Sequence, residues 1–176
     1  MLQACWIAFV DTSLCVYSRE PFIPGLKRPG FSGTVIKTII LDLNGTLSVA
    51  GNVPEGVKER LELLMSKGFK VLFFTGNTRN DADNLAADLG IEWRLAKNAE
   101  DKRDLAMELE PETCASIGNG LIDLELMKVA KLRIVTLQAE GVHIQTMLNS
   151  DIVVPNINDA LDLFLDEQRL IATLRK

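Results

Sequence analysis

One acidic side chain, Asp42, stands directly after a run of apolar and β-branched residues (38–41), and Asn44 and Thr46 follow it closely. Such a run predicts a buried parallel strand that presents a carboxylate at the carboxyl edge of a sheet, where open α/β sheets bind ligands. The alternative is an acid that only caps the following turn. This stretch alone does not separate the two interpretations.

Two later strand ends carry similar polar, turn-forming residues. Thr75-Gly76-Asn77 follows the apolar run 70–74, and Asn119-Gly120 with Asp123 follows the run 113–117, while Lys102 lies between these two stretches. A nucleophilic carboxylate, a hydroxyl, an ammonium and a second carboxylate suit phosphoryl chemistry, which depends mainly on positioning and charge neutralisation. The remaining alternative is an α/β domain whose strand ends are polar only because water solvates them.

The elements that must position these residues alternate between strand and helix. Strands are expected at 38–41, 70–74, 91–94, 113–117, 132–137 and 152–154. Helices are expected from Pro54 to Lys67, from Arg79 to Leu89, from Asn98 to about Pro111, and at 121–129, 142–148 and 157 onward. This alternation predicts an α/β fold, a three-layer Rossmann-like parallel sheet with helices on both faces.

Length and charge limit the classes of function. The chain has 176 residues, 47% of them hydrophobic, and a net charge of −5 with a pI of about 5.0. These values favour one globular domain and argue against a nucleic acid or an anionic membrane as the main partner. The apolar run 4–10 is too short to span a bilayer. Residues 1–22 are expected to be a poorly ordered extension, and residues 23–176 are expected to form the α/β domain.

Cysteine and histidine are scarce. The three cysteines, Cys5, Cys15 and Cys114, show neither metal-binding nor disulfide spacing, which favours a reducing compartment and a cytoplasmic location. The single histidine, His143, stands at an expected helix start, where a capping or surface role is more common than a catalytic one.

Four short motifs, in order along the chain, resemble those of the haloacid dehalogenase (HAD) superfamily. Leu-Asp-Leu-Asn-Gly-Thr-Leu (41–47) resembles its first motif, and Phe-Thr-Gly-Asn (74–77) its second. Glu-Asp-Lys (100–102) resembles its lysine segment, and Ile-Gly-Asn-Gly-Leu-Ile-Asp (117–123) its fourth motif. The Asn-Gly-Thr-Leu and Gly-Asn-Gly forms are most similar to the group called predicted soluble P-type ATPases.

The resemblance implies an HAD-like core, Mg²⁺ as cofactor, and a role for each matching residue. Asp42 would attack phosphorus and become an aspartyl-phosphate, with Asn44 at the position of the usual acid–base residue. Lys97 is a rival to Lys102 as the phosphate-binding lysine. The phosphate would be bound by Thr75, Lys102 and the backbone N–H groups of Leu43, Asn44 and Gly76, and Mg²⁺ by Asp42, the Asn44 carbonyl, Asn119 and Asp123.

Two departures from the family pattern bear on activity. Asn44 is an amide that cannot exchange a proton near neutral pH, and general acid–base help is typically worth about 10²–10⁴-fold. Asn119 replaces an acid and removes charge from the expected metal site. The sequence therefore predicts either a phosphohydrolase or phosphoryl-transfer enzyme, slow in hydrolysis, or a degenerate relative that binds and regulates without turnover.

The links between elements are short. Only residues 48–53 separate the first motif from the expected helix at Pro54, which leaves no room for a mobile cap domain. The expected ligand is a phosphorylated small molecule or macromolecule. Without a cap, water is excluded only if a large substrate or a neighbouring copy covers the site, and self-association is left open.

Overall fold

The six strands expected from the sequence form one parallel sheet in the computed structural model, which describes residues 35–138 and 140–175. The order across the sheet is β3-β2-β1-β4-β5-β6, and every neighbouring pair is parallel. The strands are β1 (Thr38–Asp42), β2 (Lys70–Thr75), β3 (Glu92–Leu95), β4 (Cys114–Gly118), β5 (Leu132–Thr136) and β6 (Ile152–Val154).

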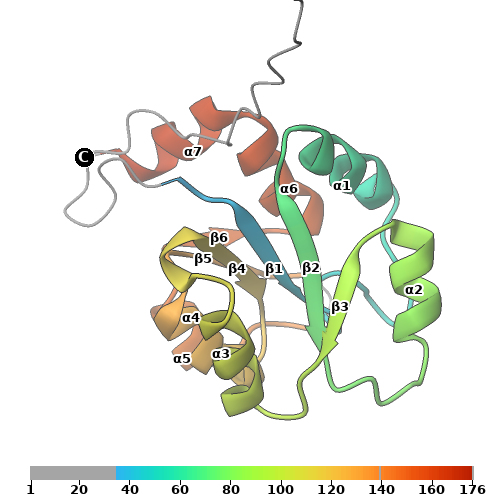
Figure 1. The fold of residues 1–176 in the computed structure, drawn as a ribbon. Helices are drawn as coiled ribbons and strands as arrows, with labels where there is room; N and C mark the ends of the chain where they lie inside the picture. The colour runs from blue at the N-terminus through green and yellow to red at the C-terminus, as the bar shows by residue number, and fades with distance from the viewer. Residues whose placement is uncertain (1–34, 139, 176) are drawn as a thin grey trace, which may run out of the picture.

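Helices cover both faces of this sheet (Figure 1). They are α1 (Val57–Ser66), α2 (Ala82–Leu89), α3 (Ala99–Met107), α4 (Leu124–Val129), α5 (Ile144–Leu148), α6 (Ile157–Leu165) and α7 (Glu167–Leu174), with 3₁₀ turns η1 (Pro111–Thr113) and η2 (Leu121–Asp123). The three-layer arrangement expected from the alternation of strands and helices is therefore confirmed.

Successive side chains of β1 point to opposite faces and explain why two layers of helices are needed. Ile39 and Leu41 belong to a large buried cluster with residues of α1, α2, α6 and α7. Ile40 belongs to a smaller buried cluster with Ala106 of α3 and Leu126 of α4. Both faces of the strand are apolar and buried. The carboxylate of Asp42, at the last residue of β1, therefore lies at the carboxyl edge of the sheet.

Two helices begin three residues later than the sequence predicted. Helix α1 starts at Val57 rather than Pro54, because Gly56 has a left-handed φ of 83° that helical residues do not adopt. Helix α2 starts at Ala82 rather than Arg79, because Asn77 and Asn80 have φ values of 49° and 55°. Asparagine tolerates this conformation better than most residues, and its frequency in turns could have indicated the later start.

The last expected helix is in fact two helices. Asp166 has an extended backbone (φ −122°, ψ 94°) that ends α6, and its side chain accepts a hydrogen bond from the Gln168 N–H at the start of α7. Such a side-chain cap satisfies one of the free N–H groups at the new helix start. The expectations for residues 1–22 and for residues 23–34 lie outside the described part of the chain.

The link between β1 and α1 folds on itself and forms no cap domain in the described chain. The Gly45 N–H donates to the Ser48 carbonyl at 2.8 Å, and the Ser48 N–H donates back to the Leu43 carbonyl at 2.8 Å. No helix within 35–138 and 140–175 is long and apolar enough to cross a membrane. The sheet order reverses between β1 and β4, and in such sheets ligands bind at this switch point.

Candidate active site

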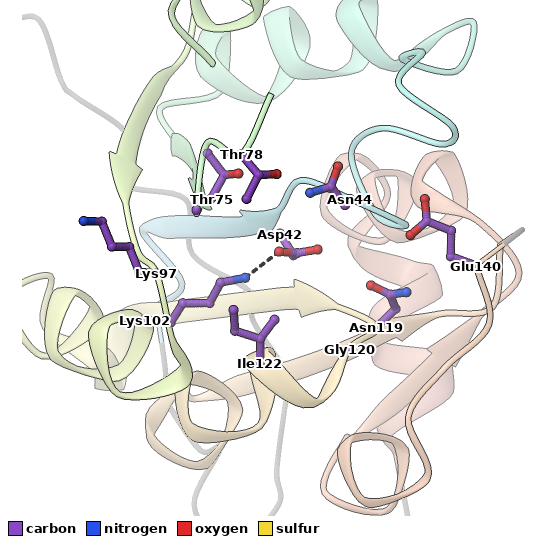
Figure 2. Close-up of a pocket in the computed structure, with 11 residues that line it drawn as sticks. Asp42, Asn44, Thr75, Thr78, Lys97, Lys102, Asn119, Gly120, Ile122 and Glu140 are labelled. Atoms are coloured by element: carbon purple, nitrogen blue, oxygen red, sulfur yellow. Dashed lines mark hydrogen bonds and ion pairs between the residues drawn. The ribbon is translucent and has the colours of Figure 1, made fainter. Parts of the chain in front are cut away.

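A cavity of about 280 Å³ opens at the carboxyl ends of the central strands (Figure 2). Ligand sites typically measure about 300–1,000 Å³, so this one is small. Four ionisable side chains line it: Asp42, Lys97, Lys102 and Glu140. Its other lining residues are Asn44, Thr75, Gly76, Thr78, Asn119, Gly120 and Ile122.

One buried ammonium group joins two carboxylates at the floor of this cavity. Lys102 reaches from α3 toward the sheet, and its Nζ donates to Asp42 Oδ1 and, at 2.7 Å, to Asp123 Oδ1. The side chains of Lys102 and Asp123 are each 1% exposed, and that of Asp42 is 10% exposed. Asp42 is thus the carboxylate of the pair that the cavity reaches.

The cluster carries one positive and two negative groups, and this imbalance changes the acidity of Asp42. Burial raises the pKa of Asp42 to about 7, and the nearby Asp123 carboxylate adds to the rise, while Lys102 and the Leu43 N–H act in the opposite direction. Burial would lower the pKa of Lys102, but the two carboxylates outweigh it and raise that pKa. Lys102 is therefore held as an ammonium.

Asp123 is held by backbone N–H groups of the fourth-motif loop. Its Oδ2 accepts hydrogen bonds from the N–H groups of Asn119 (3.0 Å) and Gly120 (2.9 Å). Gly118 lets the carboxylate come this close, since a Cβ there would lie 2.5 Å from Asp123 Cγ. Asp123 does not line the cavity, and its Oδ1 lies against the Lys102 ammonium.

Thr75 and Gly76 lie at the carboxyl end of β2, beside Asp42. Thr75 is 3% exposed, and its Oγ1 accepts a hydrogen bond from the Asn77 N–H at 3.1 Å. That contact leaves the hydroxyl hydrogen available to an oxygen in the cavity. Both residues line the cavity as the sequence predicted.

The first loop and the fourth motif are in direct contact. Thr46 Oγ1 donates to Asn119 Oδ1 at 3.3 Å, and Asn119 Nδ2 donates to the Gly141 carbonyl at 2.9 Å. Gly45 has a left-handed φ of 76°, and a Cβ there would lie 2.5 Å from Asn119 Nδ2. The Thr46 hydroxyl thus joins two loops instead of closing its own turn, while Asn44 is exposed at the rim.

Lys97 and Lys102 occupy different parts of the cavity. Figure 2 shows Lys102 directed at Asp42 and Lys97 at the opposite end of the site from Glu140. Lys97 is exposed, whereas Lys102 is buried. Only Lys102 has its ammonium on the carboxylate expected to act as the nucleophile.

The sequence of the chain is similar to those of two curated proteins. The chain is 30% identical over 137 residues to a soluble P-type ATPase-like phosphatase of Methanocaldococcus jannaschii, a match that covers 75% of this chain and 50% of that protein. It is also 49% identical over 72 residues to the uncharacterized protein MJ0073 of the same organism, covering 41% of this chain and 77% of that protein. The chain thus spans half the length of the curated phosphatase. No family model matches it.

Solved structures share the fold. The 3-deoxy-D-manno-octulosonate 8-phosphate phosphatase of Moraxella catarrhalis, solved with magnesium, phosphate and its sugar, matches 78% of this chain and 90% of its own (TM-score 0.63, 22% identity). A HAD superfamily subfamily IIIA hydrolase of Legionella pneumophila matches 79% and 87% (TM-score 0.62, 22% identity). In both sequence and fold, the chain is similar to proteins of the HAD superfamily. The expected capless HAD-like core is confirmed.

At this site, a magnesium ion would have to be bound by neutral oxygens as well as by carboxylate oxygens. No three His, Cys, Asp or Glu side chains among the described residues are grouped so that they could hold a metal ion. The cavity nevertheless offers hard oxygen donors, the carboxylate of Asp42 and the amide of Asn119, with Asn44 beside them. Together with the excess negative charge at Asp42 and Asp123, these donors fit Mg²⁺.

The sequence prediction missed one ionisable group at the site. Glu140 lines the cavity from the loop after β5, on the side of Asn44 and Asn119 (Figure 2). The signal available was its place shortly after an expected strand, at the same edge of the sheet as Asp42. His143 stands directly before α5, at the helix start as expected, and its ring Nδ1 lies 3.2 Å from Thr146 Oγ1.

Proposed function

We propose that this protein is a Mg²⁺-dependent phosphohydrolase or phosphoryl-transfer enzyme that forms an aspartyl-phosphate on Asp42. The observation that supports it most strongly is the contact of the Lys102 ammonium with the Asp42 carboxylate at the floor of a cavity. A cation in that position orients one carboxylate oxygen and leaves the other to attack. The same ammonium neutralises charge on a phosphoryl group bound beside it.

Each residue of the site has a separate task in this proposal. An Asp42 oxygen attacks phosphorus, and the bond from phosphorus to the leaving oxygen breaks. Thr75 Oγ1 donates to a phosphoryl oxygen, and Lys102 carries the opposing charge. The backbone N–H groups of Leu43, Asn44 and Gly76 are the further donors that we assign to the phosphoryl oxygens.

Magnesium would be held by the Asp42 carboxylate, the Asn44 carbonyl and Asn119. When bound, it would supply positive charge to the phosphoryl oxygens and offset the repulsion between phosphate and Asp42. Asp123 holds Lys102 through a 2.7 Å hydrogen bond and is itself held by two N–H groups. We therefore assign to Asp123 the positioning of Lys102, and its expected role as a further Mg²⁺ ligand stays a prediction.

The size of the cavity limits which part of a substrate it can enclose. A cavity of about 280 Å³ accommodates a phosphoryl group and its immediate surroundings, so the rest of a substrate would lie outside it. The phosphatase of M. catarrhalis with the same fold holds a phosphate ion and a sugar acid. We propose a phosphorylated small molecule or macromolecule as the ligand. The cytoplasmic location and the self-association considered from the sequence stay predictions.

A second candidate is a regulatory protein that binds a phosphorylated ligand without turnover. The exposed amide of Asn44 at the acid–base position is the observation that favours it. This candidate and the enzyme differ in one respect that can be measured, the covalent bond to Asp42.

The two candidates are separated by comparing the wild type with Asp42→Asn. Both are incubated with acetyl phosphate or p-nitrophenyl phosphate and Mg²⁺, and beryllium fluoride binding is followed in parallel. An enzyme loses phosphoenzyme formation and turnover by more than about 10³-fold in Asp42→Asn. Asp88→Asn, an exposed acid of α2, is the matched control and keeps both. Equal background in all three proteins would support binding without chemistry.

A further inference from the structure

The chemistry assigned to Asp42 still lacks a group that exchanges protons with the leaving oxygen and with water, and Glu140 lines the same cavity. We propose that Glu140 is the general acid and base of this site and takes over the role that Asn44 cannot perform. The inference rests on the proposed function, because it concerns the formation and hydrolysis of the Asp42 phosphoenzyme. It concerns a residue outside the four motifs that the sequence resembles.

The inventory of proton-exchanging groups leaves few candidates. Among the described residues that line the cavity, the carboxylates are Asp42 and Glu140. Asp42 is occupied as the nucleophile, and Asp123 is buried beneath Lys102 and does not line the cavity. Thr75 and Thr78 are hydroxyls, which stay protonated near neutral pH, and the two lysines are cations. Glu140 is the side chain that can both give and accept a proton there.

The backbone on both sides of Glu140 is anchored to the two loops of the site. On one side, Gln138 Nε2 donates to the carbonyls of Gly45 (3.2 Å) and Thr46. On the other side, the Gly141 carbonyl accepts the hydrogen bond from Asn119 Nδ2 at 2.9 Å. The segment around Glu140 is therefore tied to the loop that carries Asn44 and to the loop that carries Asn119.

A backbone hydrogen bond also joins the residues on either side of Glu140. The Gly141 N–H donates to the Gln138 carbonyl at 3.0 Å, and Gly141 has a left-handed φ of 76°. Figure 2 shows Glu140 on the side of the site where Asn44 and Asn119 lie, across from Lys102. A water molecule or leaving oxygen opposite Asp42 would lie on this open side, since Lys102 and Asp123 fill the floor.

The proton transfers balance over one cycle. In the first step, an Asp42 oxygen bonds to phosphorus, the bond to the leaving oxygen breaks, and that oxygen takes the proton of the Glu140 carboxylic acid. In the second step, a water oxygen bonds to phosphorus and its proton goes to the Glu140 carboxylate. The phosphorus–Asp42 bond breaks, and its electron pair returns to the Asp42 carboxylate. The products are an alcohol and inorganic phosphate, and Glu140 is protonated again.

The test measures formation and decay of the phosphoenzyme separately. Full-length wild type and Glu140→Gln are labelled with acetyl phosphate and Mg²⁺, the label is removed, and the loss of the acyl phosphate is followed. We expect the decay to slow by about 10²–10⁴-fold in Glu140→Gln, the usual worth of general acid–base help. Formation changes little, because acetate leaves as a stable anion and needs no proton.

Two further variants separate this role from a general effect of charge. Glu62→Gln, at an exposed glutamate of α1 outside the cavity, makes the same charge change and keeps the wild-type decay rate. Asn44→Asp in the Glu140→Gln background places a carboxylate on the first loop and restores decay. In the wild-type background the same change gives a much smaller gain, because Glu140 is already present.

Three results would overturn the assignment. Equal decay in Glu140→Gln and the wild type would remove Glu140 from the mechanism while leaving the Asp42 chemistry intact. Slow decay that recovers at saturating Mg²⁺ would make Glu140 a metal ligand instead. A wild type that forms no phosphoenzyme at all would end both the proposed function and the role of Glu140.

Discussion

Two of the charge clusters among the described residues of this HAD-like core are built differently. Arg133 of β5 and Asp151, just before β6, form one pair joined by two hydrogen bonds, from Nε at 2.9 Å and from Nη2 at 2.7 Å. At the candidate active site, Lys102 serves two carboxylates, Asp42 and Asp123. The first cluster is balanced in charge, and the second has an excess of one negative charge.

The difference indicates which cluster is structural. The Arg133–Asp151 pair is reinforced by the backbone, since the Arg133 N–H donates to Asp151 Oδ2 and the Asp151 N–H donates to the Arg133 carbonyl. Bidentate hydrogen bonds between a guanidinium and a carboxylate fix the two side chains relative to each other. Burial, together with the nearby Asp123 carboxylate, raises the pKa of Asp42 to about 7, so that this carboxylate favours any cation or proton that reaches it. Asp42 and Lys102 of the unbalanced cluster line the cavity described above.

Removing the cation from each cluster should give the largest difference in activity and in the free energy of unfolding. Lys102→Met leaves two carboxylates together, so we expect the loss of activity to exceed about 10³-fold and the free energy of unfolding to fall by about 3–5 kcal/mol at pH 8. At pH 5 the fall should be smaller, because Asp42 then takes up a proton. Urea unfolding at the two pH values measures this.

Arg133→Met is the matched change in the balanced cluster. Because the Arg133 side chain is 33% exposed, we expect a smaller fall, about 1–2 kcal/mol, with phosphoenzyme formation unchanged. If Arg133→Met abolished activity as well, the division into a structural and a functional cluster would be wrong.

The pH dependence of Mg²⁺ binding tests the charge excess itself. A raised folded-state pKa means that folded protein binds a proton at Asp42 that the unfolded chain has released, so without metal the stability falls as pH rises from 3.8 to about 7. Mg²⁺ must displace this proton, so its apparent dissociation constant should rise about tenfold per pH unit below pH 7 and level off above it.

Titration calorimetry or a thermal shift series from pH 5 to 8 measures this dependence. Asp42→Asn should remove it, and Arg133→Met should leave it unchanged. A Mg²⁺ affinity that does not vary with pH in the wild type would show that Asp42 does not exchange the proton for the metal.

The active site also differs from the Arg133–Asp151 pair because loop contacts, not strand pairing, hold it together. Gly45→Ala and Gly90→Ala both place a side chain at a left-handed φ (76° and 68°), but only at Gly45 would the new Cβ meet another atom, Asn119 Nδ2 at 2.5 Å. We expect Gly45→Ala to lower the free energy of unfolding by about 1–3 kcal/mol more than Gly90→Ala does.

Activity should follow the same division, because Asn119 lies in the cavity and its amide holds the loop of Glu140. Turnover falls in Gly45→Ala and stays near the wild type in Gly90→Ala. Equal stability of the two variants in chemical denaturation would mean that the loops adjust freely and do not fix the site.

How much of the site could be predicted from the sequence differs from residue to residue. Asp42 at the end of an apolar run and Thr75 at the end of the next run follow from strand periodicity, because parallel strands bring their carboxyl ends to one edge. Lys102 could be matched to a motif, but its burial against Asp42 depends on how α3 packs on the sheet. The sequence could not show that Asp123 lies under Lys102 and away from the cavity.

Glu140 was missed for a different physical reason. Its position depends on a turn closed by Gly141 and on contacts from Gln138 and Asn119, which come from separate parts of the chain. Such loop conformations leave no periodic pattern. The late starts of α1 and α2 have a similar origin, since single residues with left-handed φ interrupt an otherwise helical pattern.

The central claim is that Asp42 itself receives the phosphoryl group. The most direct measurement labels Glu140→Gln, in which the phosphoenzyme should accumulate, with acetyl phosphate and Mg²⁺, reduces the acyl phosphate with borohydride, and maps the product by peptide mass spectrometry. We predict homoserine in place of Asp42 and no change at Asp123. Reduction at another acid, or hydrolysis of phosphate esters with Asp42 unmodified, would contradict the account.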